Sequence, residues 1–127
     1  MEVVGLEGSI DHSPGGTGIL HLAGEIDMAT VDELTTWVRK LAANDSDHVL
    51  IDMSGVTFSD STCINVLVEE KKAIRDRGGR IVLVPSPPVK RLFDLGFGGQ
   101  VHAIGAETVA EGLAILESGE TAPIDAG

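Results

Sequence analysis

Apolar and polar residues follow two different periods along the chain, and these periods predict strands and helices in turn. Short, largely apolar runs predict strands, with a weaker candidate at the N-terminus. Between the runs, apolar residues recur every three or four positions, as they do on one face of a helix. The predicted strands cover residues 3–10, 19–23, 48–53, 81–84 and 101–104.

Turn and capping residues mark the boundaries of the first elements. The stretch 13–18, Ser-Pro-Gly-Gly-Thr-Gly, predicts a hairpin loop between the first two strands. Gly24-Glu-Ile-Asp27 is expected to end the second strand. Thr30 and Glu33 then have the spacing of a capping box, which predicts the start of the first helix.

Each predicted helix has one apolar side that would face a sheet. The second helix is expected to stop at Gly78-Gly79. The third begins after Ser86 with a proline and is expected to end at Gly96, and the fourth begins at Thr108. The apolar positions are Val31, Leu34, Val38 and Leu41, then Ile64, Leu67, Val68 and Ile74, then Val89, Leu92, Phe93 and Leu95, and finally Val109, Leu113 and Leu116.

The order of these elements is strand, strand, helix, and then three further strand–helix pairs. Strands that alternate with helices predict an α/β fold, here a small mixed sheet of four to five strands covered by about four helices. A chain of 127 residues fits one domain, which we place at residues 1–117. Residues 118–127 are small and polar, and we interpret them as a mobile C-terminal tail.

Composition narrows the classes of partner and compartment. Nine basic and 20 acidic residues give a net charge of −11, which argues against binding to nucleic acids or anionic membranes. No apolar run approaches the length of a membrane span, and the N-terminus lacks the basic start of a signal peptide. With one cysteine, no internal disulfide can form. These features favour a cytoplasmic protein.

Motifs for cofactors and catalysis are weak in this sequence. The four histidines, at positions 12, 21, 48 and 102, have no metal-ligand spacing, so we expect no metal. The glycine-rich stretches match neither nucleotide-binding pattern, and the serine-rich segment lacks the flanking glycines of a hydrolase elbow. We therefore expect no cofactor and no catalytic residue.

Asp60-Ser61-Thr62 places two hydroxyls and a carboxylate at the predicted start of the second helix. Such residues commonly cap a helix, because their side chains accept hydrogen bonds from the free backbone N–H groups. A helix N-terminus also favours negative charge, so a phosphate can be accommodated there. The segment is thus either a plain cap or a modification site.

Three segments resemble one family. Residues 52–64, Asp-Met-Ser-Gly-Val-Thr-Phe-Ser-Asp-Ser-Thr-Cys-Ile, resemble the central motif of STAS domains, specifically of the bacterial anti-sigma factor antagonists. Gly24-Glu-Ile-Asp27 and the stretch 89–96, Val-Lys-Arg-Leu-Phe-Asp-Leu-Gly, are similar to two further segments of that family, in the same order and spacing. The resemblance covers about residues 3–117.

The resemblance implies a partner-switching function without catalysis. An unphosphorylated antagonist binds an anti-sigma factor, a serine kinase of the GHKL type, and thereby frees the sigma factor. The kinase phosphorylates the serine after the motif's aspartate, here Ser61 with Thr62 as the second choice, and a PP2C-type phosphatase restores the protein. The implied partner-binding residues are Asp27, Ser59, Asp60, Ser61, Thr62, Cys63 and Asn65.

Cys63 departs from the family pattern, which has a glycine at this position. It is interpreted as a small apolar residue in the first turn of the helix, or alternatively as a redox-sensing thiol, because a helix N-terminus can lower a thiol pKa. The same departure keeps a second function open, a non-phosphorylated STAS adaptor subunit of a signalling or transport complex. A ligand-binding STAS domain is a third hypothesis, and self-association is left open.

Overall fold

The computed structural model describes residues 5–43, 48–97 and 104–118. They contain a five-stranded sheet in which the strands lie in the order of the sequence. The first two strands are antiparallel, and the others join in parallel, so the predicted mixed α/β sheet is confirmed. The strands are β1 (Leu6–His12), β2 (Gly18–Ile26), β3 (His48–Ser59), β4 (Arg80–Pro85) and β5 (Ile104–Gly105).

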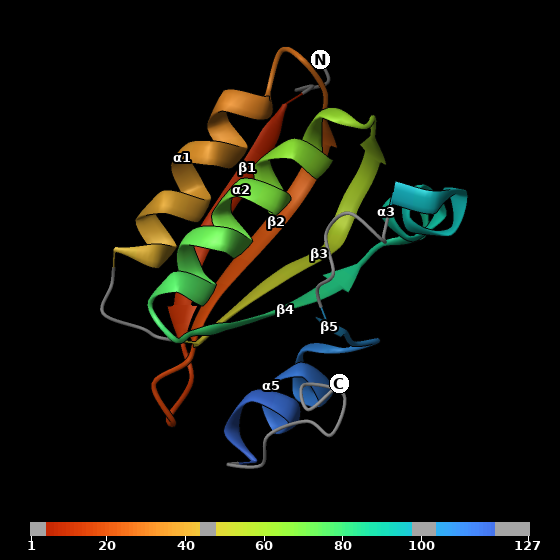
Figure 1. The fold of residues 1–127 in the computed structure, drawn as a ribbon. Coiled ribbons are helices and arrows are strands. Elements are labelled where there is room, and N and C mark those ends of the chain that lie inside the picture. The colour runs from red at the N-terminus through yellow and green to blue at the C-terminus, as the bar shows by residue number, and fades with distance from the viewer. Residues whose placement is uncertain (1–4, 44–47, 98–103, 119–127) are drawn as a thin grey trace.

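Helices cover both faces of this sheet (Figure 1). α1 and α2 lie side by side on one face, and α5 lies on the other face against β3 and β4. α3 follows the carboxyl end of β4 and continues into a π-helical turn, η1. The bounds are α1 (Val31–Ala42), α2 (Thr62–Asp76), α3 (Pro87–Leu92), η1 (Phe93–Phe97) and α5 (Val109–Glu117).

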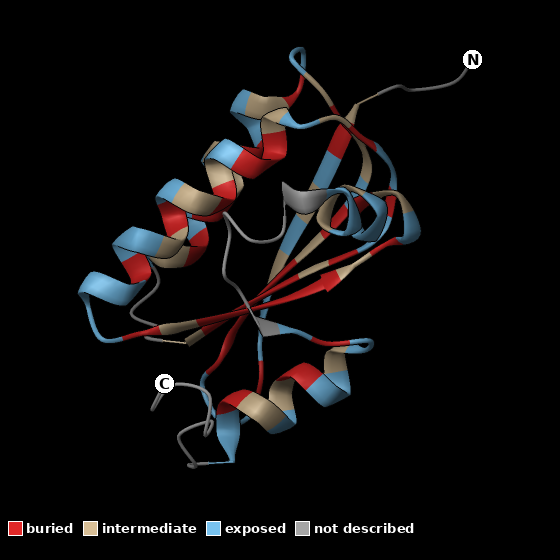
Figure 2. Ribbon diagram, turned by 45° about the vertical axis from the view of Figure 1, so that its right-hand side comes forward, coloured by how far each residue is buried: buried red, intermediate tan, exposed pale blue. Residues whose placement is uncertain are grey.

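Alternating side chains divide the core between the two faces. Leu20 and Leu22 of β2 pack under α1 and α2, whereas Ile19 points to the face that α5 covers. β3 repeats this pattern, with Leu50 on the α5 face and its neighbours Val49 and Ile51 on the other. Figure 2 shows the resulting runs of buried residues along the central strands and on the helix sides that face them. The near-continuous apolar runs in the sequence therefore reflect strands that are covered on both faces.

β2 continues through the segment that was expected to end it. Gly24 has a φ of +113° and sits in a shift of the pairing register between β2 and β3. A Cβ atom on Gly24 would lie 2.0 Å from the carbonyl oxygen of Gly5. The glycine therefore marks an irregularity inside a strand rather than its end, and the strand runs on to Ile26.

Several predicted ends of strands and helices were wrong, because the elements continue beyond them. β3 runs to Ser59 and not to residue 53, because pairing with β2 continues beyond its apolar part. Gly96 does not stop the third helix, which passes into η1, and Leu95 is 70% exposed instead of lying on the apolar side. β1 runs on to His12, two residues beyond its predicted end, and the predicted positions 3 and 4 lie outside the described residues.

The remaining boundary predictions fall partly outside the described residues. The last strand was predicted at residues 101–104, of which 101–103 are outside, and the described strand is Ile104–Gly105. The proposed tail lies outside apart from Ser118, which caps α5. Thr108 begins α5 as predicted, and its side chain accepts a hydrogen bond from Glu111 N. Within the described ranges, no helix has the length and apolar character needed to cross a membrane.

Candidate functional site

The carboxyl ends of β2 and β3 bring two sequence-predicted segments together. Ile26, the last residue of β2, is paired with Ser59, the last residue of β3. Just beyond this pair, Asp60 N donates a hydrogen bond of 3.1 Å to Ile26 O. The loops that carry Asp27 and Asp60 are thus joined at one edge of the sheet, where the functional groups of parallel sheets commonly gather.

Asp60, and not a hydroxyl, caps α2. Its Oδ1 atom accepts hydrogen bonds from Thr62 N at 2.9 Å and from Thr62 Oγ1. Ser61 occupies the N-cap position, but its side chain makes no capping hydrogen bond. A carboxylate near a helix N-terminus is also favoured by the helix dipole. The prediction of capping at this segment is confirmed, although the group that performs it is the aspartate.

This division of roles leaves Ser61 as the accessible hydroxyl. Ser61 is exposed, and its Oγ atom has no hydrogen-bond partner among the residues that the structure describes. Asn65 is also exposed and lies four residues further along α2, on the same side of the helix. Thr62 is half-buried, and its hydroxyl proton is engaged with Asp60.

Asp27 stabilises the neighbouring loop in a comparable way. Its Oδ1 atom accepts hydrogen bonds from Ala29 N at 2.9 Å and from Thr30 N at 3.1 Å. Thr30 is 7% exposed, and its hydroxyl links Glu25 O with Asp27 N. The predicted capping box is therefore wrong in its chemistry, because Thr30 bonds backwards to the loop and makes no side-chain cap on α1.

Ser59 and Cys63 lie beneath the surface of the site. Ser59 is 8% exposed and Cys63 is fully buried. Ser59 Oγ donates to Cys63 Sγ at 3.1 Å. Burial, with a smaller contribution from the charge of Asp60, raises the pKa of the Cys63 thiol. Both features oppose the reactivity that a redox sensor needs, so the structure favours the packing role of this residue.

Among the described residues, three large apolar side chains are exposed towards the carboxyl ends of the strands, a feature that sequence reasoning missed. Met28 is 82% exposed in the loop after β2, and Phe58 is 49% exposed next to the last residue of β3. Leu95 belongs to η1, beyond the carboxyl end of β4. Singly exposed apolar side chains are common on protein surfaces, and a contiguous apolar patch is what marks a contact surface. Only Leu95 carried a misleading signal, since its helical spacing predicted burial.

Asp52 and His21 form a further polar pair that the sequence did not reveal. They face each other on adjacent strands, and His21 Nδ1 lies 2.8 Å from Asp52 Oδ2. Burial, the largest influence, raises the pKa of Asp52, but hydrogen bonds from Ser54 and His21 together lower it below its usual value. Among the described residues, no three His, Cys, Asp or Glu side chains gather in a way that could hold a metal ion.

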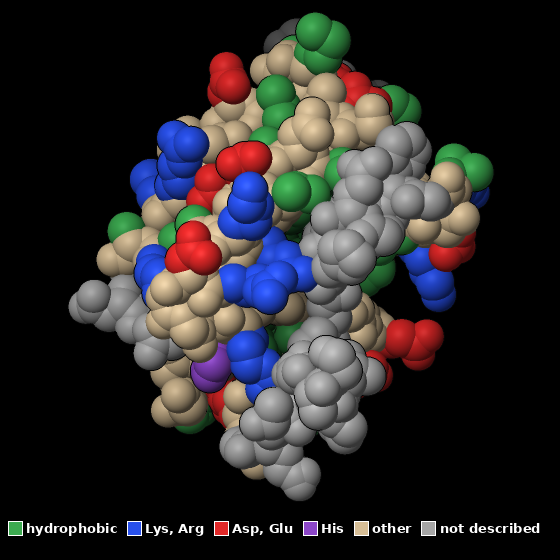
Figure 3. Space-filling model, viewed as in Figure 1, with side chains coloured by type: hydrophobic (Ala, Val, Ile, Leu, Met, Phe, Trp, Pro, Cys, Tyr) green, Lys and Arg blue, Asp and Glu red, His purple; other side chains and the backbone are tan. Residues whose placement is uncertain are grey.

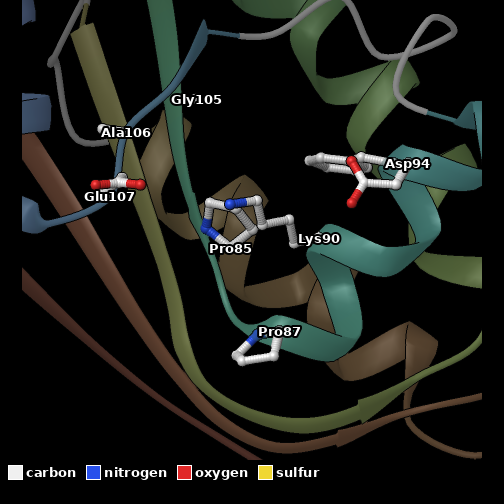
Figure 4. A pocket seen from close by; sticks show the side chains of 8 residues that line it. Pro85, Pro87, Lys90, Asp94, Gly105, Ala106 and Glu107 are labelled. Atoms are coloured by element: carbon white, nitrogen blue, oxygen red, sulfur yellow. The ribbon is translucent and has the colours of Figure 1, made fainter.

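A separate hollow lies between α3 and the segment that follows β5. It measures about 530 Å³. Figure 4 shows Lys90 and Asp94 on the α3 and η1 side, with Glu107 on the opposite side. One cation between two carboxylates is a poor match for the phosphates of a nucleotide, which need several positive groups or free N–H donors. This hollow therefore gives no support to nucleotide binding.

Known proteins of similar sequence and structure agree on one family. The anti-sigma F factor antagonist of Paenibacillus polymyxa is 28% identical over 82 residues, which are 63% of this chain and 70% of that protein. An anti-sigma factor antagonist from Mycobacterium paratuberculosis has a similar structure, with a TM-score of 0.76, 21% identity, and coverage of 87% of this chain and 93% of that one.

A second solved structure has the same fold. The anti-sigma factor antagonist SpoIIAA in its unphosphorylated form gives a TM-score of 0.71 at 19% identity, covering 91% of this chain and 100% of that one. The family model described as the STAS domain matches residues 10–102. The match spans β2, β3 and the loops that carry Asp27 and Ser61. The chain therefore belongs to the STAS domain family.

Proposed function

We propose that this chain is an anti-sigma factor antagonist, a cytoplasmic protein without catalysis of its own, whose binding is switched at Ser61. The observation that carries the proposal is the exposed, unengaged Ser61 hydroxyl at the N-terminus of a 15-residue helix. The names of the similar proteins support the antagonist role. The exposed apolar side chains of Met28 and Phe58 lie at the carboxyl ends of β2 and β3, as Ser61 does, and would add apolar contacts with the anti-sigma factor.

Phosphorylation would switch this surface through charge. A GHKL-type kinase partner transfers the γ-phosphoryl group of ATP to Ser61 Oγ, which loses its proton, and ADP leaves. The phosphate adds a charge of about −1.5 to −2 beside the carboxylate of Asp60. A contact that buries this group must remove it from water next to a like charge, and a loss of about 1.4 kcal/mol weakens binding tenfold. A PP2C-type phosphatase reverses the step by hydrolysis.

The geometry favours Ser61 over Thr62 as the acceptor. Thr62 Oγ1 donates to Asp60 and is half-buried, so a kinase would first have to break the cap of α2. Ser61 needs no such rearrangement, because Asp60 already satisfies Thr62 N. Thr62 therefore remains the second choice.

The other implied contact residues take two roles. Asn65 and Asp27 lie at the surface or close to it and can contact the partner. Ser59 and Cys63 are buried and would act by supporting the first turn of α2. Cys63 stands where the family has glycine, and because it is fully buried it adds no exposed side chain to the turn.

The test is capture of partners with matched baits. Purified Ser61→Ala and Ser61→Asp proteins are immobilised and exposed to lysate of the source cells, and bound proteins are identified by mass spectrometry. Ser9→Asp serves as the control, because Ser9 is an exposed serine on β1, away from the α2 N-terminus. We expect a kinase of the GHKL type on Ser61→Ala and Ser9→Asp but not on Ser61→Asp.

Incubation of that kinase with ATP and the wild-type chain then locates the phosphate. Phosphate on Ser61, absent from Ser61→Ala, supports the switch. If Ser61→Asp retains the same partners as Ser61→Ala, the switch is refuted, and the non-phosphorylated adaptor becomes the better description. Capture of no anti-sigma factor by any bait would contradict the antagonist role itself.

A further inference from the structure

Basic residues are distributed very unevenly along this acidic chain. Seven of the nine lie at positions 39–40 and 71–80, although the net charge of the chain is −11. The other two, Lys90 and Arg91, are adjacent on α3. The seven are Arg39, Lys40, Lys71, Lys72, Arg75, Arg77 and Arg80. Two guanidinium nitrogens of Arg80 are buried, so we call the surface formed by the other six the basic face.

The fold brings the two stretches together on the face of the sheet that α1 and α2 cover. Arg39 and Lys40 are in the last turn of α1, and Lys71, Lys72 and Arg75 lie in the second half of α2. Arg77 follows α2 and donates a hydrogen bond of 2.8 Å to Ala42 O at the end of α1, and Arg80 begins β4. Arg39 Nε lies 3.5 Å from Glu70 Oε2, which joins the two helices at this level. Figure 3 shows Lys and Arg side chains gathered over α1 and α2, with several Asp and Glu side chains between them.

Local stability explains part of this cluster but not all of it. Cations near the C-terminal ends of α1 and α2 are favoured by the helix dipoles. Glu70, which is 8% exposed, pairs with Arg39 through Nε alone. The Arg39 side chain is 72% exposed, and its terminal nitrogens carry the other four N–H donors.

The cations also repel one another. Lys71 and Arg75 are four residues apart on one side of α2, a spacing at which like charges destabilise a helix. Burial, followed by the charge of Arg75, lowers the pKa of Lys71. Like charges held this close reduce the stability of the isolated chain, and an anion placed over them would remove that cost.

We propose that the basic face docks an acidic segment of a partner protein, at a surface separate from Ser61. Carboxylates fit the forked N–H donors of Arg39 and Arg75 and the ammonium groups of Lys40 and Lys72. This surface does not depend on the proposed switch, because Lys72 and Arg75 lie 11 and 14 residues from Ser61 along α2, about 16–21 Å at 1.5 Å per residue.

Other anionic partners fit the molecule less well. A nucleic acid is an extended polyanion, and the acidic remainder of this chain would repel it beyond the basic face. A membrane surface favours apolar anchors beside the cations. Within the described ranges, the exposed large apolar side chains, Met28, Phe58 and Leu95, lie towards the carboxyl ends of the strands, away from the basic face.

The test compares two charge reversals of equal size. Binding of a fluorescein-labelled decaglutamate peptide is measured by anisotropy at low salt, with the full chain. Lys72→Glu/Arg75→Glu reverses two exposed cations of the basic face, and Lys90→Glu/Arg91→Glu reverses the two on α3. Both change the net charge equally. We expect at least a tenfold weaker Kd for the first variant, less than a twofold change for the second, and unchanged binding for Ser61→Asp.

Each alternative result would overturn the proposal. Equal weakening by both reversals would mean that the peptide responds to net charge and not to the basic face. Absence of peptide binding to the wild type would show that the basic face is not a docking surface. Loss of binding in Ser61→Asp would show that the basic face is not independent of the Ser61 site. Tighter binding of duplex DNA or phosphatidylglycerol vesicles, lost in Lys72→Glu/Arg75→Glu, would assign the basic face to those partners instead. Circular dichroism checks that both double variants are folded.

Discussion

The starts of α1 and α2 lie next to each other and use the same residue types for different purposes. Each helix follows a strand and is preceded by an aspartate whose Oδ1 atom accepts hydrogen bonds from backbone N–H groups, Asp27 before α1 and Asp60 before α2. At α1 the nearby hydroxyl, Thr30, is buried and bonded to the loop. At α2 the Ser61 hydroxyl is exposed.

This difference separates a structural hydroxyl from one that is available for chemistry. Thr30 joins Glu25 O and Asp27 N, so its removal would leave two backbone groups without partners. Ser61 can be changed or modified without a comparable loss, because Asp60 performs the capping. Substitution of Thr30 should therefore lower stability, whereas substitution of Ser61 should change partner binding with little effect on stability.

The largest effect is expected inside β2, two residues before the strand ends. Gly24→Ala places a side chain at a φ of +113° and a Cβ atom 2.0 Å from Gly5 O. Backbone strain of this kind costs about 1–3 kcal/mol, and the backbone contact adds to it, so we expect a loss of more than about 3 kcal/mol. The free energy of unfolding in urea measures it.

Gly78→Ala is the matched control for that substitution. Gly78 also has a positive φ, +79°, but a Cβ atom there would meet no atom within 4 Å. Strain alone should cost about 1 kcal/mol at this helix end. Equal losses at the two glycines would show that the contact with Gly5 is unimportant.

The next prediction tests the two hydroxyls directly. Thr30→Val keeps the shape of the side chain but removes the hydroxyl, and it should cost about 1–3 kcal/mol because buried polar groups lose their partner. Ser61→Ala should change stability by less than about 0.5 kcal/mol. Thermal and urea unfolding of both variants measure the difference. A larger loss for Ser61→Ala than for Thr30→Val would reverse the comparison.

How far the sequence predicted these features depends on the range of the interactions. Helix starts and strand cores were recognisable, because periodicity and capping residues act over a few positions. The continuation of β2 past Gly24 and of β3 to Ser59 was missed, since both depend on pairing between strands distant in sequence. Leu95 was wrongly placed in the core, because helical spacing alone does not show whether another element packs against that side of the helix.

The site shows the same limit. The stretch 59–62 predicted hydroxyls and a carboxylate at a helix start, but not which side chain would cap the helix and which would be exposed. That choice depends on backbone angles and on the hydrogen bond between Asp60 N and Ile26 O. The pairing of His21 with Asp52 and the clustering of the basic face likewise need the fold, since their members are about 30 residues apart.

A smaller effect is expected for the two aspartates that precede the helices. Asp27→Ala and Asp60→Ala each remove an acceptor of backbone N–H groups, and each should cost about 1 kcal/mol, as the loss of a helix cap usually does. Urea unfolding measures both, with the exposed first-turn residue Asp32→Ala as control. A loss at Asp60 no larger than at Asp32 would argue that Asp60 is not the cap of α2.

The smallest effect concerns Asp52, which repeats the geometry of Asp60 inside a strand. Asp52 Oδ1 accepts hydrogen bonds from Ser54 N at 3.0 Å and Ser54 Oγ at 2.6 Å, as Asp60 does from Thr62. Although burial raises the pKa of Asp52, these bonds and the contact with His21 lower it below 3.8, the value for the unfolded chain.

A lowered folded-state pKa fixes the direction of the pH dependence. The stability from ionised Asp52 is fully present above pH 3.8 and is lost as the pH falls through the folded pKa, because the unfolded chain binds the proton first. Ser54→Ala removes one of the hydrogen bonds to Asp52, so it should raise the Asp52 pKa. It should also reduce the part of the stability that is lost in acid. Carboxyl-carbon NMR titration of the folded proteins follows the shift. An Asp52 titration midpoint at or above pH 3.8 in the wild type would show that burial outweighs the hydrogen bonds. The hydrogen bonds to Asp52 would then not stabilise its ionised form, and the comparison with Asp60 would fail.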